Sequence, residues 1–266
     1  MILKREDVSF LMLHKWEGIV IKARAYGESN KIVTLMTREA GKVAVMARGA
    51  KKPRSRLAAV TQPFTIGSYM VMHTSGMGTL QQGEHLQMLR HIHQDIVATA
   101  YASFIVELVE RVVEEGQPQP YAYEVLYQAL RAIEEEYDPE AISLFVEWKM
   151  LPFIGVQPIV HECAACGATD GEFAFSFSEG GFICHRCFHV DPYIIRLTPT
   201  QVKLIRMFYQ LPIEQVGKLD LKKETKYFIR KIVSTMYEEQ GGLRLKTRSF
   251  IEQLERTPQL RRRDDE

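Results

Sequence analysis

The sequence predicts an α+β multidomain chain, in which an N-terminal β-barrel is followed by a helical domain with an inserted four-cysteine module. Three observations predict it. Short alternating segments with Gly-rich turns fill the first third of the chain, helical periodicity begins near residue 95, and all four cysteines lie between residues 163 and 187. A chain of 266 residues with 46% hydrophobic and 25% charged residues has the length and composition of a globular protein with two domains.

The charge of the chain is unevenly distributed, although its formal net charge is only +1. Residues 1–83 carry a net charge of +8, residues 84–149 carry −9, and the remainder carries +2. This asymmetry predicts a basic module that meets a polyanion, joined to a module that does not.

The first residues are excluded from the predicted fold. The apolar run from Val8 to Leu13 is too short for the core of a signal peptide and has no small-residue cleavage site. Met1 and Met12 both remain possible initiators, so residues 1–11 are treated as an upstream extension. Because no apolar run reaches the ~18–20 residues of a membrane span, a cytoplasmic protein without a membrane partner is expected.

Residues 12–90 are predicted to form the barrel. Gly41 supplies a permissive backbone in the turn between the second and third strands. Five β segments in ~70 residues fit a small closed barrel, and the OB-fold is favoured over an SH3-like barrel, which fits the same pattern. The expected strands are residues 18–25, 31–37, 43–47, 62–73 and 78–87.

The helical domain is predicted in two parts, residues 91–160 and 192–255, separated by the module at 161–191. Asp138 is expected to cap a helix with Pro139 at its first position, and residues 198–201 form a capping-box sequence. Gly241 and Gly242 end a helix that starts near Lys222. A short helix near residues 250–254 precedes a charged tail at 256–266.

The cysteines have the spacing of a four-thiolate zinc site. Cys163 and Cys166 are separated by two residues, as are Cys184 and Cys187, with seventeen residues between the pairs. Four thiolates complete a tetrahedron, so one structural Zn²⁺ is expected, with no position open for water or substrate.

Other uses of these cysteines were weighed. Two disulfides are disfavoured in a cytosolic chain without a signal peptide. A redox pair needs only one Cys-x-x-Cys motif, and it needs a βαβ context that is not evident. The nearby His161, His185 and His189 are assigned to the surroundings of the metal.

A basic segment is the second candidate site. Residues 48–56 place five positive charges in nine residues, and no acidic residue occurs between Ala40 and Gly83. Such a surface is typical of proteins that track phosphates, although a solvated loop is the alternative. Tyr26, Phe64 and Tyr69 are candidates for stacking on bases, or for the core in the case of Phe64 and Tyr69. Residues 74–79 are interpreted as a Gly-rich turn rather than a phosphate cradle.

No catalytic motif was found, and the protein is predicted not to be an enzyme. The P-loop, His-Glu-x-x-His and Gly-x-Ser-x-Gly patterns are absent from the sequence. The acidic residues of the middle helices are at spacings typical of a solvated face.

Several stretches of the chain carry a resemblance to a known family. They are Glu17-Gly-Ile-Val-Ile, Tyr26-Gly-Glu-Ser-Asn-Lys-Ile-Val-Thr-Leu, Val45-Met-Ala-Arg-Gly-Ala-Lys-Lys-Pro, Gly78-Thr-Leu-Gln-Gln-Gly-Glu and Gly181-Phe-Ile-Cys-His-Arg-Cys. Together they resemble the RecO family of bacterial DNA repair and recombination proteins, in its zinc-bearing form, and the resemblance covers nearly the whole chain from Met12.

The resemblance implies binding of single- and double-stranded DNA, annealing of complementary strands, and loading of RecA onto strands coated by single-strand-binding protein. It also implies RecR and the C-terminal tail of single-strand-binding protein as partners, and association with the nucleoid when bound to DNA. The implied DNA contacts are Lys22, Arg24, Arg38, Lys42, Arg48, Lys51, Lys52, Arg54 and Arg56.

Two rival functions remain at this point. In a protein-interaction adaptor, the zinc and helical modules would recruit partners and the basic loop would be incidental. A zinc-dependent nucleic-acid enzyme is disfavoured, because four thiolate ligands leave no free coordination site. The segment between the cysteine pairs has three acidic and no basic residues, so the metal is expected to order the insertion rather than to contact DNA.

Overall fold

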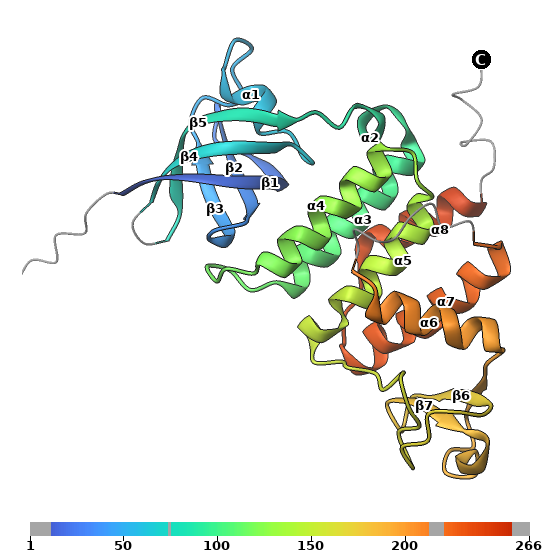
Figure 1. Ribbon diagram of the computed structural model, residues 1–266. Helices are drawn as coiled ribbons and strands as arrows, with labels where there is room; N and C mark the ends of the chain where they lie inside the picture. The colour runs from blue at the N-terminus through green and yellow to red at the C-terminus, as the bar shows by residue number, and fades with distance from the viewer. Residues whose placement is uncertain (1–11, 74–75, 213–220, 257–266) are drawn as a thin grey trace, which may run out of the picture. The chain divides into compact units, whose positions relative to one another are not determined.

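The computed structural model describes residues 12–73, 76–212 and 221–256 (Figure 1). The chain divides into two compact units, and each is described by itself. Unit 1 comprises Met1–Arg90 and Val113–Leu130, and unit 2 comprises His91–Val112 and Arg131–Glu266. The predicted charged tail at 256–266 lies almost entirely outside the described residues.

Unit 1 is built on a closed five-stranded barrel with the strand order β1-β2-β3-β5-β4, drawn in blue to teal in Figure 1. The neighbouring strands are antiparallel except β3 and β5, which pair in parallel at Val45↔Gly78 and Met46↔Thr79. The predicted N-terminal OB-type barrel is thereby confirmed. Its strands are β1 (Met12–Tyr26), β2 (Asn30–Thr37), β3 (Gly41–Ala47), β4 (Ile66–His73) and β5 (Gly78–Gln87).

The barrel interior is filled by side chains from alternate positions of the strands. Val33, Leu35 and Val45 are completely buried, as is Tyr69. The Tyr69 hydroxyl donates toward the carbonyls of Val60 (3.1 Å) and Thr65 (3.3 Å), and burial raises the pKa of Tyr69. A Cβ atom on Gly67 would lie 2.9 Å from the Tyr69 ring and 2.7 Å from a backbone oxygen, so this large ring requires glycine there.

Residues 113–130 belong to the same compact unit as the barrel. Gly116 N donates to Lys42 O (2.9 Å), and a Cβ atom on Gly41 would lie only 1.8 Å from Gln117 O. Gly41 also has a φ of +71°, as the predicted turn requires. Close backbone contacts therefore tie the β2–β3 turn to this segment.

Unit 2 is helical. Local sequence explains where two of its helices begin, as predicted: Asp138 accepts hydrogen bonds from Glu140 N and Ala141 N, and Thr198 forms a capping box with Gln201. Its helices are α2 (Arg90–Gln94), α3 (Ile96–Val112), the end of α4 (Pro120–Glu134), α5 (Pro139–Met150), α6 (Pro199–Gln210), α7 (Lys223–Thr235) and α8 (Lys246–Arg256).

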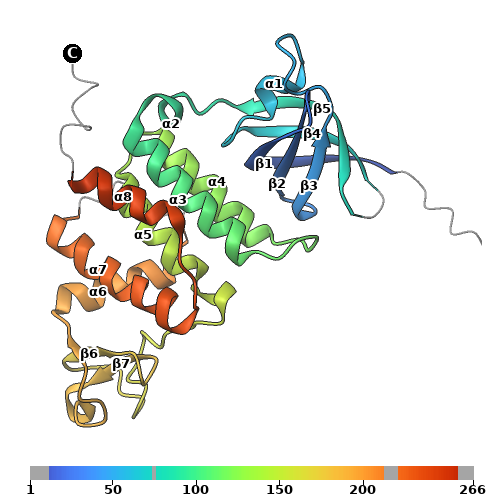
Figure 2. The ribbon, with the colours of Figure 1, turned by 180° about the vertical axis from the view of Figure 1, so that it is seen from behind.

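The core of unit 2 lies between α3, α5, α6, α7 and α8. Phe145 of α5 meets Phe208 of α6 edge to face, with ring centroids 5.6 Å apart. Figure 2 shows α8 beside α3, and the two helices are in contact. Only Ile251 and Leu254 of α8 are buried, so polar contacts attach much of this helix to the rest of unit 2.

A charged network joins these helices. Arg230 of α7 pairs with Glu140 of α5 and with Glu255 of α8, while Lys226 lies 2.8 Å from both Asp138 and Glu140. Buried Glu147 pairs with Arg248. Burial raises the pKa of Glu147 despite this pairing.

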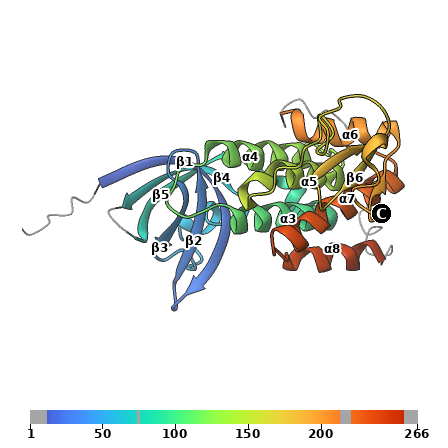
Figure 3. The same ribbon diagram turned by 90° about the horizontal axis from the view of Figure 1, so that it is seen from below.

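The four-cysteine module contains a small antiparallel sheet that the sequence did not predict. Its strand order is β7-β6-β8, with β6 (Phe173–Ser176), β7 (Gly181–Cys184) and β8 (Ile195–Arg196). Short runs of two to four residues carry no alternation that could be recognised in a sequence. Figure 3 shows β6 beside α6, and side chains of the two elements are in contact.

Some boundaries differ from the predicted ones. β1 begins at Met12 rather than Gly18, and β4 begins at Ile66 because Phe64 has a φ of +66°. A short helix, α1 (Leu57–Val60), follows the basic loop. The helix expected near residues 250–254 extends over Lys246–Arg256, and α7 continues as a π-helical turn (Met236–Gln240) before the predicted glycine pair. Short 3-10 helices lie at Leu151–Ile154 and His185–Cys187.

Among the described residues, none of the helices combines the length and apolar character needed to span a bilayer.

Candidate metal centre and nucleic-acid interface

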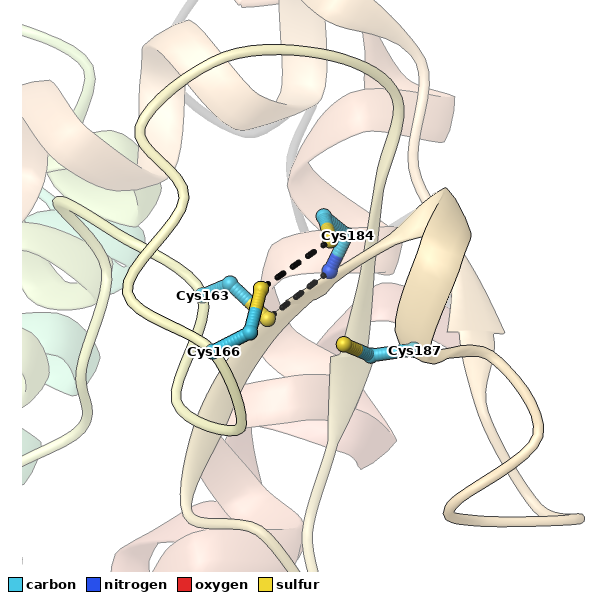
Figure 4. A group of neighbouring side chains, drawn as sticks. All are labelled: Cys163, Cys166, Cys184 and Cys187. Atoms are coloured by element: carbon cyan, nitrogen blue, oxygen red, sulfur yellow. Dashed lines mark hydrogen bonds between the residues drawn. The ribbon is translucent and has the colours of Figure 1, made fainter.

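The four cysteines converge from two knuckles (Figure 4). Cys163 and Cys166 lie in the loop before β6, where Gly167 N donates to Cys163 O (2.8 Å) and closes a tight turn. Cys184 ends β7, and Cys187 ends the 3-10 helix that follows it. The backbone N–H of Cys184 donates to Cys163 Sγ (3.2 Å), which connects the two knuckles.

The spacing of the sulfur atoms fits a tetrahedral ion. All four Sγ atoms lie within 4.8 Å of one another, and Cys166 Sγ is 3.6 Å from Cys184 Sγ. Four sulfurs at 2.3 Å from a central ion would be about 3.8 Å apart. The cysteines are free thiols rather than disulfides. The predicted grouping of all four is confirmed, and the donor set is compatible with a metal ion.

The electrostatics of the cluster favour binding of a cation. For Cys184, burial raises the pKa, but hydrogen bonds from Arg186 and from the neighbouring thiols lower it to about 6. For Cys187, the hydrogen bond with Cys166, together with burial, raises the pKa to about 12. Burial also raises the pKa of Cys163, but hydrogen bonds from backbone N–H groups outweigh it and lower this pKa overall. Two of the thiols thus ionise more easily than usual, whereas ionisation of Cys187 is opposed. A divalent cation would remove this penalty and ionise all four thiols.

The surroundings of the cluster agree with a closed structural site. Cys163, Cys184 and Cys187 are buried, and Cys166 is exposed. Within the described ranges, the group of ligating atoms consists of these cysteines without a histidine. Exposed Arg186 hydrogen-bonds the Cys184 sulfur, and this bond is the main reason that the pKa of Arg186 is raised.

The charged side chains of the basic loop lie on the surface of unit 1, while Ala50 of the loop is buried in the barrel core. Its five cationic residues are all exposed: Arg48, Lys51, Lys52, Arg54 and Arg56. Three hydrogen bonds fix the loop to the β1–β2 turn. Asn30 Oδ1 accepts from Gly49 N (2.9 Å), Ser29 O accepts from Lys51 N (2.9 Å), and Gly27 O accepts from Lys51 Nζ (3.2 Å).

The loop therefore lies beside the β1–β2 turn, at the end of β1 that carries Tyr26. Lys22, Arg24 and Tyr26 follow one another on the outer face of β1, because Ala23 between them packs against the barrel core. Tyr26 is 54% exposed, whereas Phe64 and Tyr69 are buried and belong to the core. We call the surface formed by Lys22, Arg24, Tyr26 and residues 48–56 the basic face.

Arg38 and Lys42 lie away from the basic face. They flank the β2–β3 turn, whereas the loop follows the opposite end of β3, about 25 Å away for strands of seven to eight residues. Arg38 is 3.1 Å from Glu124 Oε2 and lies over the Tyr123 ring, and Lys42 is only 8% exposed. Their predicted contacts with DNA stay untested.

Two organising residues were missed in the sequence. Asn30 anchors the basic loop through Gly49, and Tyr123 of α4 contacts both Arg38 and Glu17, with its hydroxyl 2.8 Å from Glu17 Oε1. An asparagine next to a hairpin turn is a weak indication of such an anchor in the sequence, because asparagine side chains often hydrogen-bond to nearby backbone. Nothing in the sequence pointed to Tyr123, because its partners lie more than eighty residues earlier.

Comparisons with known proteins cover both units. A family model described as Recombination protein O N terminal matches residues 12–89, and one described as Recombination protein O C terminal matches residues 93–249. The chain is 48% identical over 244 residues to the DNA repair protein RecO of Bacillus subtilis, covering 92% of this chain and 96% of that protein. It is 47% identical over 254 residues to the DNA repair protein RecO of Listeria monocytogenes serotype 4a, covering 96% of this chain and 100% of that protein.

Proposed function

The chain belongs to the recombination protein O family, and from that premise we propose that it binds DNA and acts in DNA repair and homologous recombination. Within this role, it binds single- and double-stranded DNA, anneals complementary strands and helps to load RecA onto strands coated by single-strand-binding protein. Its action is non-enzymatic.

The basic face is the observation that carries the proposal. Five exposed cations of the loop lie beside the β1–β2 turn of an OB-type barrel, and Lys22, Arg24 and the exposed Tyr26 ring lie on the strand that enters this turn. Single-stranded nucleic acids are commonly held by a cationic groove for the backbone and aromatic rings for the bases. The hydrogen bonds that the loop donates to Asn30, Ser29 and Gly27 hold it in place before DNA arrives, which reduces the entropy lost on binding.

Annealing follows from charge neutralisation. Two strands repel one another through their phosphates, and lysine and arginine side chains lower this repulsion when they bind both strands. Base pairing then supplies the sequence specificity, so the protein needs few contacts to base edges.

We propose that the cysteine cluster holds one structural Zn²⁺, with Cys163, Cys166, Cys184 and Cys187 as its ligands. Zinc supplies folding energy to the module and no chemistry, since the four thiolates complete its coordination. The free Cys-x-x-Cys pairs and the short sulfur distances support zinc as the ion.

The proposed protein partners are RecR, the C-terminal tail of single-strand-binding protein and, functionally, RecA. The proposed location is the cytoplasm, with association with the nucleoid through DNA. The domain limits at residues 12–90, 91–160, 161–191 and 192–255 remain part of the proposal.

One observation favours a second candidate function, a protein-interaction adaptor without a direct role on DNA. A groove of about 790 Å³ lies between the module and α6, lined largely by apolar side chains such as Leu197, Val202 and Met207. Apolar grooves of this size are typical of ligand or peptide sites. A direct DNA titration separates the two candidates.

The salt dependence of DNA binding tests the proposal. Each phosphate contact to single-stranded DNA contributes about −0.7 to the slope of log K against log salt. Replacing Arg48, Lys51, Lys52, Arg54 and Arg56 by Ala is expected to weaken binding to every oligonucleotide sequence and to make the slope shallower by up to about 3.5 units. Fluorescence anisotropy over a salt series measures both quantities.

A matched control removes the same number of exposed cations from unit 2, at Lys203, Lys222, Lys223, Lys231 and Arg244. This control is expected to bind DNA nearly as the parent does. If the loop variant is folded and keeps the parental affinity and slope, the DNA site lies elsewhere. A parent chain whose affinity does not change with salt would contradict DNA binding through phosphates altogether.

A further inference from the structure

Arg206 of α6 makes an unusual set of contacts with the metal module. Its Nε donates to Val160 O (2.8 Å), and its Nη2 donates to His161 O (3.1 Å). The same guanidinium lies over the rings of Phe173 (5.1 Å) and Phe182 (5.7 Å). A single side chain thus binds the backbone that enters the module and the aromatic faces of its two main strands.

All four partners of Arg206 are adjacent to the metal ligands. Val160 and His161 precede Cys163 by three and two residues, and Phe182 precedes Cys184 by two. Phe173 is the register partner of Cys184 in the β6–β7 ladder. Arg206 therefore fixes the chain next to Cys163 in the first knuckle and next to Cys184 in the second.

Few other polar contacts join the module to the helices. Among the hydrogen bonds of the described residues, Gln240 Nε2 donates to Phe177 O (3.2 Å), at the opposite end of β6 from Phe173. The module has a small core of its own, centred on Phe173, Phe175 and Phe182. Such a module depends on the metal and on its attachment for order.

We propose that Arg206 is a positioning residue for the metal centre, and that metal binding and docking of the module on α6 are coupled through it. The inference rests on the zinc proposed above. Because coupling is reciprocal, loss of Arg206 weakens metal binding, and loss of the metal loosens α6. The groove between the module and α6 shares this dependence, since Phe173 and Arg206 both line it.

Metal affinity of the full chain tests the proposal directly. Zinc affinity is measured by competition with a chromophoric chelator, for the parent, Arg206→Gln, Arg206→Lys and the control Lys203→Gln. Lys203 is exposed on the same helix and also lines the groove. Groups that hydrogen-bond metal ligands are typically worth ten- to a hundred-fold in affinity. Arg206 contacts residues next to the ligands rather than the ligands, so a loss near the lower end, about ten-fold, is expected for Arg206→Gln.

Arg206→Lys is expected to fail as a rescue. An ammonium carries the same charge but cannot lie flat on two rings while donating to two carbonyls in a fixed geometry. Equal zinc affinity in the parent and Arg206→Gln would overturn the proposal, as would an equal loss in Lys203→Gln. A lower urea midpoint for Arg206→Gln with unchanged zinc affinity would also overturn it, because the role would then be merely structural.

A second measurement uses the unaltered chain, so that it does not depend on whether a variant folds. Hydrogen exchange is followed with and without zinc, and metal removal is expected to increase exchange in residues 161–191 and in α6. An increase confined to residues 161–191 would contradict the coupling. A parent chain that binds no zinc at its four thiols would instead overturn the zinc proposal, and this inference with it.

Discussion

Two tyrosines of the barrel show how the environment of a residue decides its role. Tyr69 is completely buried, with its hydroxyl directed at two carbonyls, whereas Tyr26 is 54% exposed at the end of β1. The sequence made both candidates for stacking and left Tyr69 open between stacking and the core, because strand aromatics usually belong to the core. The distinction required the register of the strands, which sets the face that each ring occupies.

Replacing Tyr26 by Ala is expected to weaken binding of single-stranded DNA about five-fold or more, since a base stacked on an aromatic ring contributes ~1–3 kcal/mol. Tyr26→Phe keeps the ring and is expected to bind nearly as the parent does. Anisotropy titrations with a short oligonucleotide measure the three affinities. Tyr193→Ala is the matched control, because Tyr193 is 86% exposed on the module side of unit 2. Equal binding by the Ala and Phe variants would exclude stacking on this ring.

The metal ligands were the residues most completely predictable from the sequence. Their spacing alone implied a common centre, because each Cys-x-x-Cys turn directs two sulfurs to one point. The neighbours that support them were not predictable. Arg206 belongs to α6, and nothing in the helical pattern of α6 indicates a contact with the module. Its contacts depend on how the small sheet of the module packs on that helix.

At the scale of elements, helix caps formed by neighbouring residues could be predicted from the sequence, whereas a cap supplied by a residue far away in the sequence could not. Asp138 and Thr198 cap the helices that their sequences predict. In contrast, the N-terminus of α8 is capped by a residue 139 positions earlier, Glu107 of α3. Its carboxylate accepts from Lys246 N (3.0 Å), from Thr247 N (2.9 Å) and from the Thr247 hydroxyl (2.6 Å).

Glu107→Gln is expected to destabilise the docking of α8 by about 1 kcal/mol at neutral pH, the usual value of a helix cap. Burial raises the pKa of Glu107, but the hydrogen bonds from Thr247 and Lys246 outweigh it, and the pKa is lowered overall. A lowered carboxyl pKa stabilises the folded state above the unfolded value of about 4.3, and this contribution is lost as the pH falls through the folded value.

Urea unfolding at pH 7 and near pH 3 measures this effect. The parent should be more stable than Glu107→Gln at pH 7, and the difference should shrink in acid. Glu114→Gln changes an exposed carboxylate and serves as the control. A difference that stays constant across this pH range would show that the charge of Glu107 is not involved.

At the scale of the whole molecule, the charge asymmetry of the sequence predicted which part meets a polyanion. The structure refines that prediction, because the nine cations assigned to DNA do not form one surface. Seven of them belong to the basic face, whereas Arg38 and Lys42 flank the β2–β3 turn beside residues 113–130. The sequence could not separate the two groups, since they alternate along residues 22–56.

The metal centre and the basic face lie in different compact units, and this division makes a prediction about metal removal. Mild chelation is expected to increase hydrogen exchange in residues 161–191, because the module loses the ion that orders it. The affinity of the chain for single-stranded DNA should change less than two-fold, because the basic face is anchored by its own hydrogen bonds to the β1–β2 turn. Parallel exchange and anisotropy measurements on one chelated sample provide the comparison, and re-addition of zinc controls for irreversible loss. A loss of DNA affinity that follows the loss of zinc, in a chain whose barrel amides stay protected, would instead place the metal module in the DNA interface.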